Sequence, residues 1–144
     1  MRSLVLIMIL AAGAGGLQAQ QREAVRPDGA GTRGPYTPGI RHGNIVYASG
    51  QLGFRGNALV SGGIRAETRQ ALENLDRIFQ ASGTTIRNAL KCSVFLTDMN
   101  DFAAMNEAYI AFFPDDPPAR TTVAVAALPV PGARVEIDCI AAII

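Results

Sequence analysis

Apolar side chains repeat at helical spacing in two parts of this chain. Over residues 65–81 they recur every three or four positions, which predicts an amphipathic helix that ends near Ser82-Gly83. Its buried face would be made by Thr68, Ala71, Leu72, Leu75, Ile78 and Phe79. A second helix is predicted over residues 101–113, with Asn100 as its N-cap and Pro114 at its end. Its apolar face would be made by Phe102, Met105, Tyr109 and Phe112.

Four other stretches are rich in β-branched and apolar residues, and this composition predicts strands. They span residues 44–49, 90–96, 121–127 and 134–143. Residues 50–53 continue extended, short strands flank a turn at residues 55–57, and residues 34–39 form a turn. The order of these elements predicts an α+β domain, with a mixed sheet of five or six strands and two helices packed on one face.

The last strand has two faces of different character. Val135, Ile137, Cys139 and Ala141 point one way, and Glu136, Asp138, Ile140 and Ala142 point the other. The second face is half apolar, and no further element remains to cover it. We therefore expect a homo-oligomer in which the sheets of the subunits face one another.

The N-terminal residues differ from the rest. Arg2, an apolar run over residues 4–10 and a small-residue site ending at Ala19 together predict a signal peptide over residues 1–19. The run is short for a membrane span, although an uncleaved anchor is an alternative. Residues 20–33 read as a flexible lead-in and residues 34–144 as a single domain. We expect export to the periplasm and no membrane contact after cleavage, or a cytoplasmic location if the start is misassigned.

Charge and cysteine content narrow the function. The chain carries 13 Lys and Arg against 12 Asp and Glu, for a formal net charge of +1, which argues against a nucleic-acid partner. Two cysteines and one histidine, His42, make no metal-ligand cluster. Cys92 and Cys139 lie in strand-like runs, where two buried thiols are favoured over a disulfide, which would need adjacent strands in suitable register.

Two charged residues interrupt the apolar C-terminal strands. Arg120 follows the Pro117-Pro118 pair, and Glu136 lies inside the last strand. If these strands pair as a hairpin, both side chains lie at one end of the sheet. There an arginine can hold a carboxylate by two parallel hydrogen bonds, and a glutamate can take a proton from water. The alternatives are an ion pair between them or two solvated charges, which composition alone favours.

Three further residues are candidates for the same site. Tyr36 lies in a rigid Gly-Pro-Tyr turn, where it either faces a ligand or packs over the sheet edge. Asn106 lies on the second helix, where solvation is the alternative. Gly50 lets a ligand approach the backbone closely, or simply marks a bulge. The sequence contains no Ser-His-Asp arrangement and no phosphate-binding glycine motif.

These segments together resemble the reactive intermediate deaminase family, also called the YjgF or RidA family. The resemblance covers residues 35–144 and is carried by Gly34-Pro35-Tyr36, Tyr47-Ala48-Ser49-Gly50-Gln51, Asn100-Asp101-Phe102, Asn106, Phe112-Phe113, Pro118-Ala119-Arg120-Thr121-Thr122-Val123, Leu128-Pro129 and Val135-Glu136-Ile137-Asp138. It implies a chorismate-mutase-like fold and a homotrimer with sites in the clefts between subunits. The implied reaction hydrolyses enamines and imines, such as 2-aminoacrylate and 2-iminopropanoate, to 2-keto acids and ammonia without a cofactor.

The resemblance also implies residue roles. Arg120 would hold the substrate carboxylate, Glu136 would position or activate water, Tyr36 and Asn106 would line the cleft, and Gly50 and Thr122 would offer backbone groups. Many relatives have cysteine where Thr122 stands, which excludes a thiol role here. The segment between Pro129 and Glu136 is one residue longer than the commonest pattern.

A non-catalytic protein is the rival interpretation. It would be an exported trimer that binds small carboxylates, or a holdase-like member of the same family. Some members of the family are described as ribonucleases, which the neutral charge makes the weakest option. Retention of both Arg120 and Glu136 favours the enzyme, because a carboxylate-binding protein needs only the arginine.

Overall fold

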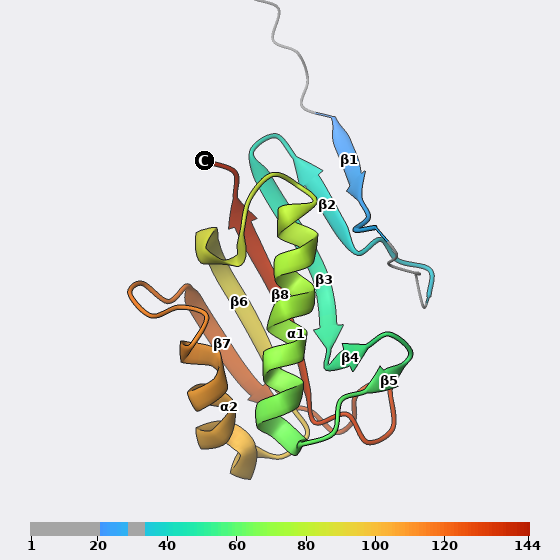
Figure 1. The fold of residues 1–144 in the computed structure, drawn as a ribbon, viewed down its shortest axis with the longest axis vertical. Coiled ribbons are helices and arrows are strands. Elements are labelled where there is room, and N and C mark those ends of the chain that lie inside the picture. The colour runs from blue at the N-terminus through green and yellow to red at the C-terminus, as the bar shows by residue number, and fades with distance from the viewer. Residues whose placement is uncertain (1–20, 29–33) are drawn as a thin grey trace, which may run out of the picture.

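The computed structural model describes residues 21–28 and 34–144, which form a sheet with two helices on one face (Figure 1). The six-stranded sheet has the order β1-β2-β3-β8-β6-β7, and β4 and β5 form a separate small hairpin. The strands are β1 Arg22–Val25, β2 Gly39–His42, β3 Ile45–Leu52, β4 Phe54–Arg55, β5 Ala58–Leu59, β6 Ala89–Leu96, β7 Ala119–Ala124 and β8 Val135–Ala142. The helices are α1 Gly63–Gln80 and α2 Phe102–Ile110, with 3-10 turns at Ile86–Asn88 and Met99–Asp101. The predicted α+β architecture is confirmed.

The core lies between α1 and the centre of the sheet. Leu72, Leu75 and Phe79 are fully buried on α1, as the helical spacing predicts. Burial alternates along β8, so its odd-numbered residues face the helices. The predicted stop of α1 is also confirmed, since Gly83 has a φ of 84° and Thr84 N–H donates to the Phe79 carbonyl at 3.0 Å.

The N-terminal part of the described chain contains a strand that the sequence did not predict. β1 pairs antiparallel with β2, from Arg22 opposite His42 to Val25 opposite Gly39. The expectation of a flexible lead-in is therefore wrong for residues 22–25, and β2 replaces part of a predicted turn. β1 is a short edge strand that is joined to β2 by backbone hydrogen bonds, and its exposed side chains carry little pattern. The predicted signal peptide lies outside the described residues.

The last two strands do not form the predicted hairpin. β7 is parallel to β6, and β6 lies between β7 and β8. The physical reason is the strand–helix–strand order of β6, α2 and β7, because a crossover helix returns the chain parallel to the first strand. In this register Arg120 lies beside Cys92, whereas Glu136 lies beside Phe95.

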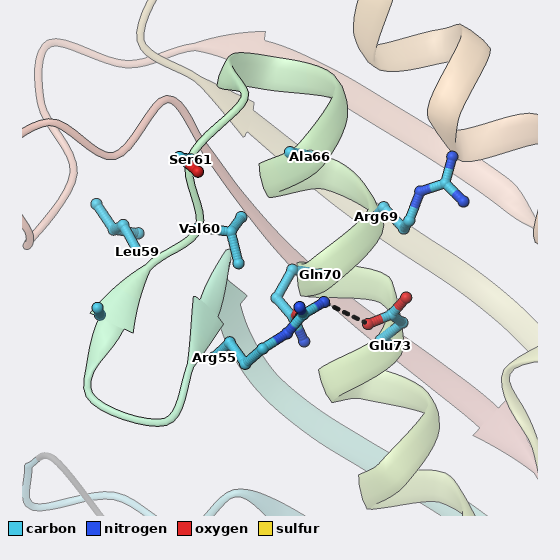
Figure 2. A pocket seen from close by; sticks show the side chains of 9 residues that line it. Arg55, Leu59, Val60, Ser61, Ala66, Arg69, Gln70 and Glu73 are labelled. Carbon is cyan, nitrogen blue, oxygen red and sulfur yellow. Dashed lines mark hydrogen bonds and ion pairs between the residues drawn. The ribbon is translucent and has the colours of Figure 1, made fainter.

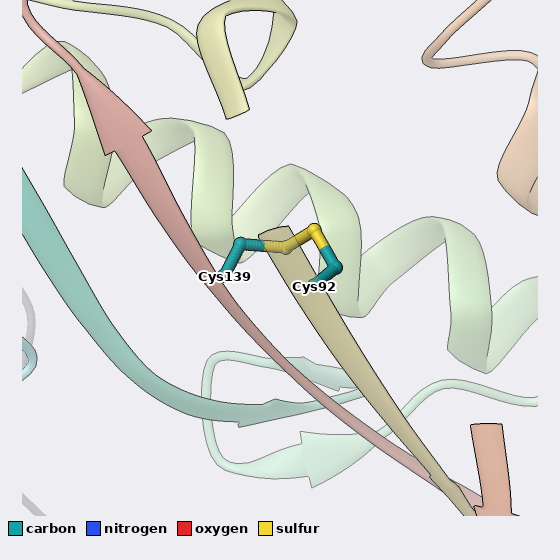
Figure 3. Close-up of a disulfide and its surroundings, with 2 residues drawn as sticks. All are labelled: Cys92 and Cys139. Carbon is teal, nitrogen blue, oxygen red and sulfur yellow. A yellow bond between two sulfur atoms is a disulfide. The ribbon is translucent and has the colours of Figure 1, made fainter. Parts of the chain in front are cut away.

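Cys92 and Cys139 form a disulfide between β6 and β8 (Figure 3). They are direct register partners with Cα atoms 4.1 Å apart, and both side chains are buried. The prediction of two free thiols is wrong, because sequence could not place these positions opposite one another. In the part of the chain that the structure describes, no helix is long and apolar enough to span a membrane.

We predict that the disulfide stabilises the fold substantially. It connects residues 47 positions apart, so it restricts the unfolded chain. A Cys92→Ala/Cys139→Ala variant should lose about 2–4 kcal/mol of unfolding free energy, measured by guanidinium unfolding at one protein concentration. Reductant should lower the midpoint of the wild type and leave that of the double variant unchanged. Equal midpoints for the two proteins without reductant would contradict the prediction.

Candidate functional site

Arg120 lies at the start of β7, beneath α2. Its guanidinium carbon is 4.7 Å from the ring centroid of Tyr109 and 5.8 Å from that of Phe102, and both rings belong to α2. The side chain lines a pocket of about 590 Å³. The other lining residues are Ala103, Asn106, Glu107, Tyr109, Ile110, Pro117 and Pro118. Asn106 is half-buried, and the structure brings it together with Arg120 in the lining of this pocket.

The pocket leaves the guanidinium of Arg120 without an acidic partner. The carboxylate among its lining residues, Glu107, accepts two hydrogen bonds from Arg65 of α1, at 2.6 and 2.8 Å. Within residues 21–28 and 34–144, Arg120 has no ion pair and no side-chain hydrogen bond. A free guanidinium can bind a carboxylate through two parallel hydrogen bonds.

Two hydroxyl groups near Arg120 also have no partner among the described residues. They are the phenol of Tyr109 and the Oγ1 of Thr122, which follows Arg120 by two positions and shares its face of β7. Burial raises the pKa of Tyr109 to about 12, and the positive charge of Arg120 opposes part of that rise. The phenol is therefore neutral at physiological pH. We found no sequence signal for Tyr109 beyond its place on the apolar helix face.

Glu136 lies on the opposite face of the sheet from Arg120. Arg120 shares the helix-facing side with its buried register partner Cys92, whereas Glu136 alternates with the buried residues Val135 and Ile137. The sequence expectation that one chain brings Arg120 and Glu136 together is wrong. It failed because β6 separates the two strands and the side chains point to different faces.

Gly50 makes room for the side chain of Glu136. It lies in an irregular part of β3, between Ala48 and Gln51, where the register with β8 shifts. A Cβ atom built on Gly50 would overlap Oε1 of Glu136 and would lie 2.9 Å from its Cδ. The structure therefore shows the bulge that was one of the two alternatives for Gly50, and the group that approaches the glycine within this chain is the side chain of Glu136.

Tyr36 lies in the segment beside Gly50. Ser49 fixes this segment by donating its hydroxyl to the Thr37 carbonyl at 2.7 Å and its N–H to the Pro38 carbonyl at 2.8 Å. The side chain of Tyr36 is exposed. The structure therefore separates the predicted residues Arg120, Asn106 and Thr122 from Glu136 and Gly50. We call Arg120, Asn106 and Thr122, together with Tyr109, the arginine pocket, and we call Glu136 and Gly50 the glutamate face. Among the described residues, no contact places Tyr36 in either group.

A second carboxylate, Asp138, lies on the same face as Glu136, although it was not among the candidate site residues. Partial burial raises the pKa of Glu136, and the negative charge of Asp138 raises it further. Burial also raises the pKa of Asp138, against a hydrogen bond from Ser93 and the charge of Lys91. The sequence does contain a signal for Asp138, because residues two positions apart on a strand, such as Glu136 and Asp138, lie on the same face.

An ion pair connects the start of β8 to the start of α2. Arg134 donates from Nε and Nη2 to the two carboxylate oxygens of Asp101, at 2.8 and 2.6 Å. Its backbone N–H donates to buried Glu67 of α1 at 2.9 Å. These bonds fix the strand two residues before Glu136 against both helices.

Another pocket, of about 400 Å³, lies between the β4–β5 hairpin and α1 (Figure 2). Figure 2 shows Arg55 reaching toward Gln70 and Glu73, whereas Arg69 points away from them. Arg55 donates to Gln70 at 2.9 Å and lies 4.0 Å from Glu73. These contacts engage Arg55, Gln70 and Glu73 with one another. Elsewhere among the described residues, no three His, Cys, Asp or Glu side chains gather as metal ligands would.

Comparison with known proteins defines the family. The sequence model of the family described as Endoribonuclease L-PSP matches residues 11–143, so the chain belongs to this family. The chain is 44% identical over 110 residues to the mouse (Mus musculus) 2-iminobutanoate/2-iminopropanoate deaminase, covering 75% of this chain and 81% of that protein. The expected family and its enzyme class, a hydrolytic deaminase, are confirmed at this level.

Two further relatives add to this comparison. The Schizosaccharomyces pombe protein mmf2, mitochondrial, is 41% identical over 111 residues, covering 76% of this chain and 88% of that protein. The crystal structure of E. coli TdcF with bound serine superposes with a TM-score of 0.76 at 33% identity, covering 83% of this chain and 98% of that chain. The expectation of export to the periplasm is wrong, because relatives such as mmf2 are mitochondrial proteins.

We predict that substitutions of two nearby glycines affect different properties, one the activity and the other the stability. In Gly50→Ala the new methyl group displaces the carboxylate of Glu136, so deaminase activity should fall at least tenfold while the melting temperature changes little. In Gly53→Ala the methyl group meets backbone, with the Glu67 Cα at 2.6 Å, so the melting temperature should fall. Calorimetry and turnover measured on both variants test this. A fully active Gly50→Ala protein would remove Glu136, as placed here, from the site.

Proposed function

We propose that this protein hydrolyses reactive 2-imino acids of the 2-aminoacrylate and 2-iminopropanoate type to 2-keto acids and ammonia. The observation that carries the proposal is the guanidinium of Arg120, which lines a pocket and has no acidic partner among the described residues. Such a group suits the carboxylate of a small amino-acid derivative. The names of the mouse deaminase and of the serine-bound TdcF structure support this substrate class.

The reaction needs one proton acceptor and a fixed substrate. Arg120 holds the substrate carboxylate, and Asn106 lines the same pocket. Glu136 accepts a proton from water as the water oxygen bonds to the carbon of the protonated imine, and the pair of electrons in the C=N bond moves to nitrogen, which gives a neutral carbinolamine. Glu136 then returns the proton to nitrogen, the C–N bond breaks as the hydroxyl oxygen forms the C=O bond of the keto acid, and the hydroxyl proton passes to solvent as ammonia leaves. An iminium carbon is already electrophilic, so orientation supplies much of the catalysis.

The two groups of residues require more than one chain to form one site. The arginine pocket lies beside α2 on the helix-covered face, and the glutamate face lies on the uncovered side of the sheet. We propose a homotrimer in which the glutamate face of one subunit meets the arginine pocket of its neighbour. Exposed apolar side chains on the uncovered face and its edge support such contact; they include Tyr47, Leu90 and Val123. Tyr36 and the backbone of Thr122 complete the cleft.

A trimer that only binds small carboxylates is the alternative. It would use Arg120 in the same way but would not need Glu136, so turnover distinguishes the two. The formal net charge of +1 gives no support to the ribonuclease activity in the family's description.

We predict that Arg120→Ala and Glu136→Gln each abolish most turnover in an assay that generates imines with an amino-acid oxidase and traps survivors with semicarbazide. Arg120→Ala should fail mainly through loss of binding. Glu136→Gln should retain binding of pyruvate and lose about 10²- to 10⁴-fold in kcat. Normal suppression of trapping by either variant would remove that residue from the mechanism. No suppression by the wild type with any amino acid would leave only the binding protein.

Mixing these two inactive variants tests whether the site is shared. Co-refolding equal amounts should restore activity to about one site in four, because a site is complete when one variant supplies Arg120 and the other supplies Glu136. Each variant refolded alone is the control. Light scattering after size-exclusion chromatography should show a trimer, and a monomer or an inactive mixture would contradict intersubunit sites.

We predict that, on the acid side of its pH profile, kcat/KM falls at a pH above the ordinary pKa of a glutamic acid. Glu136 must be deprotonated to act, and burial together with Asp138 raises its pKa, so activity is lost as pH falls through that raised value. Asp138→Asn removes the like charge and should therefore lower the pKa of Glu136. The acid limb should move to lower pH than in the wild type. A limb that stays in place or moves upward would show that Asp138 does not act on Glu136.

A further inference from the structure

The guanidinium of Arg120 is supported by aromatic faces. Its central carbon lies 4.7 Å from the centroid of the Tyr109 ring and 5.8 Å from that of Phe102. Glu107, which lines the same pocket, is engaged by Arg65. In the described part of the chain, the contacts of the guanidinium are therefore with rings and not with carboxylates.

This kind of support has a specific chemical consequence. The five N–H groups of arginine lie in the plane of the guanidinium, whereas a ring attracts the cation through its face. A carboxylate neighbour would orient the side chain but would also occupy its donors and neutralise its charge. Aromatic support restrains Arg120 and leaves its donors available for a ligand.

Tyr109 is suited to this task because its own ring is held firmly. Its side chain is 3% exposed, and its ring centroid lies 4.8 Å from that of Phe113. Phe102, in contrast, is exposed and farther from Arg120. The phenol oxygen of Tyr109 has no partner among the described residues, so the ring is the part that makes the contact with Arg120.

We infer that Tyr109 is a positioning residue for carboxylate recognition: its ring face orients the guanidinium of Arg120 so that both donors of one edge reach the substrate carboxylate. This inference rests on the proposed role of Arg120. It assigns the contribution to the aromatic ring and none to the hydroxyl. The inference therefore predicts different outcomes for loss of the ring and loss of the hydroxyl.

Three variants separate these contributions. Tyr109→Leu keeps an apolar side chain and removes the ring, and should raise KM and the Kd for pyruvate about tenfold while kcat changes less than about twofold. Tyr109→Phe keeps the ring and should bind pyruvate like the wild type. Phe113→Leu is the matched control, because Phe113 is equally buried and contacts Tyr109, and no contact joins it to Arg120 in the described chain. It should lower the melting temperature and change the Kd for pyruvate far less than Tyr109→Leu does.

The experiment uses the full chain, with turnover by the imine-trapping assay and pyruvate binding by titration calorimetry. Weak pyruvate binding by both Tyr109→Phe and Tyr109→Leu would overturn the inference, because the hydroxyl would then be required. Equal weakening by Tyr109→Leu and Phe113→Leu would also overturn it, in favour of a purely structural role. If the wild type binds pyruvate without turnover, the proposed function fails and the binding comparison still decides the role of Tyr109. If the wild type does not bind pyruvate, the inference fails with the role of Arg120.

Discussion

Side chains alternate between the two faces of a β-sheet, and this constraint decides where each charged group of the candidate site lies. On β7 the even-numbered residues face the helices, so Arg120 lies beneath α2. On β8 the odd-numbered residues face the helices, so Glu136 lies on the uncovered side. A single subunit therefore holds the cation and the carboxylate apart, although both belong to the same sheet.

This separation has an electrostatic consequence. A guanidinium and a carboxylate brought together in one chain would pair and neutralise one another. Here Glu107, the acid that lines the pocket of Arg120, is engaged by Arg65, and burial together with the negative charge of Asp138 raises the pKa of Glu136. In the proposed mechanism, each group therefore remains available for a ligand that carries a carboxylate at one end and a centre for water attack at the other. Assembly of subunits is then the step that would complete the site.

A disulfide and an ion pair hold the arginine pocket and the strand of Glu136 in a fixed arrangement within one subunit. The disulfide joins Cys139 of β8 to Cys92 of β6, and Cys92 is also the register partner of Arg120 on β7. The Asp101–Arg134 pair joins the N-terminal end of α2 to the start of β8. The helix that carries Asn106 and Tyr109 is thereby connected to the strand that carries Glu136. We therefore expect little movement of the arginine pocket relative to Glu136 within one subunit.

The sequence by itself determined the local structure and the chemical inventory. Helical spacing identified both helices and the buried face of α1, and the order of elements identified the α+β class, because these signals act over a few neighbouring residues. The motifs also singled out Arg120, Asn106, Gly50 and Glu136. Tertiary structure alone decided their grouping, the pairing of Cys92 with Cys139, the strand β1 and the contact of Tyr109 with Arg120. Strand order and register bring together residues far apart in the chain, and no local pattern records which strands become neighbours.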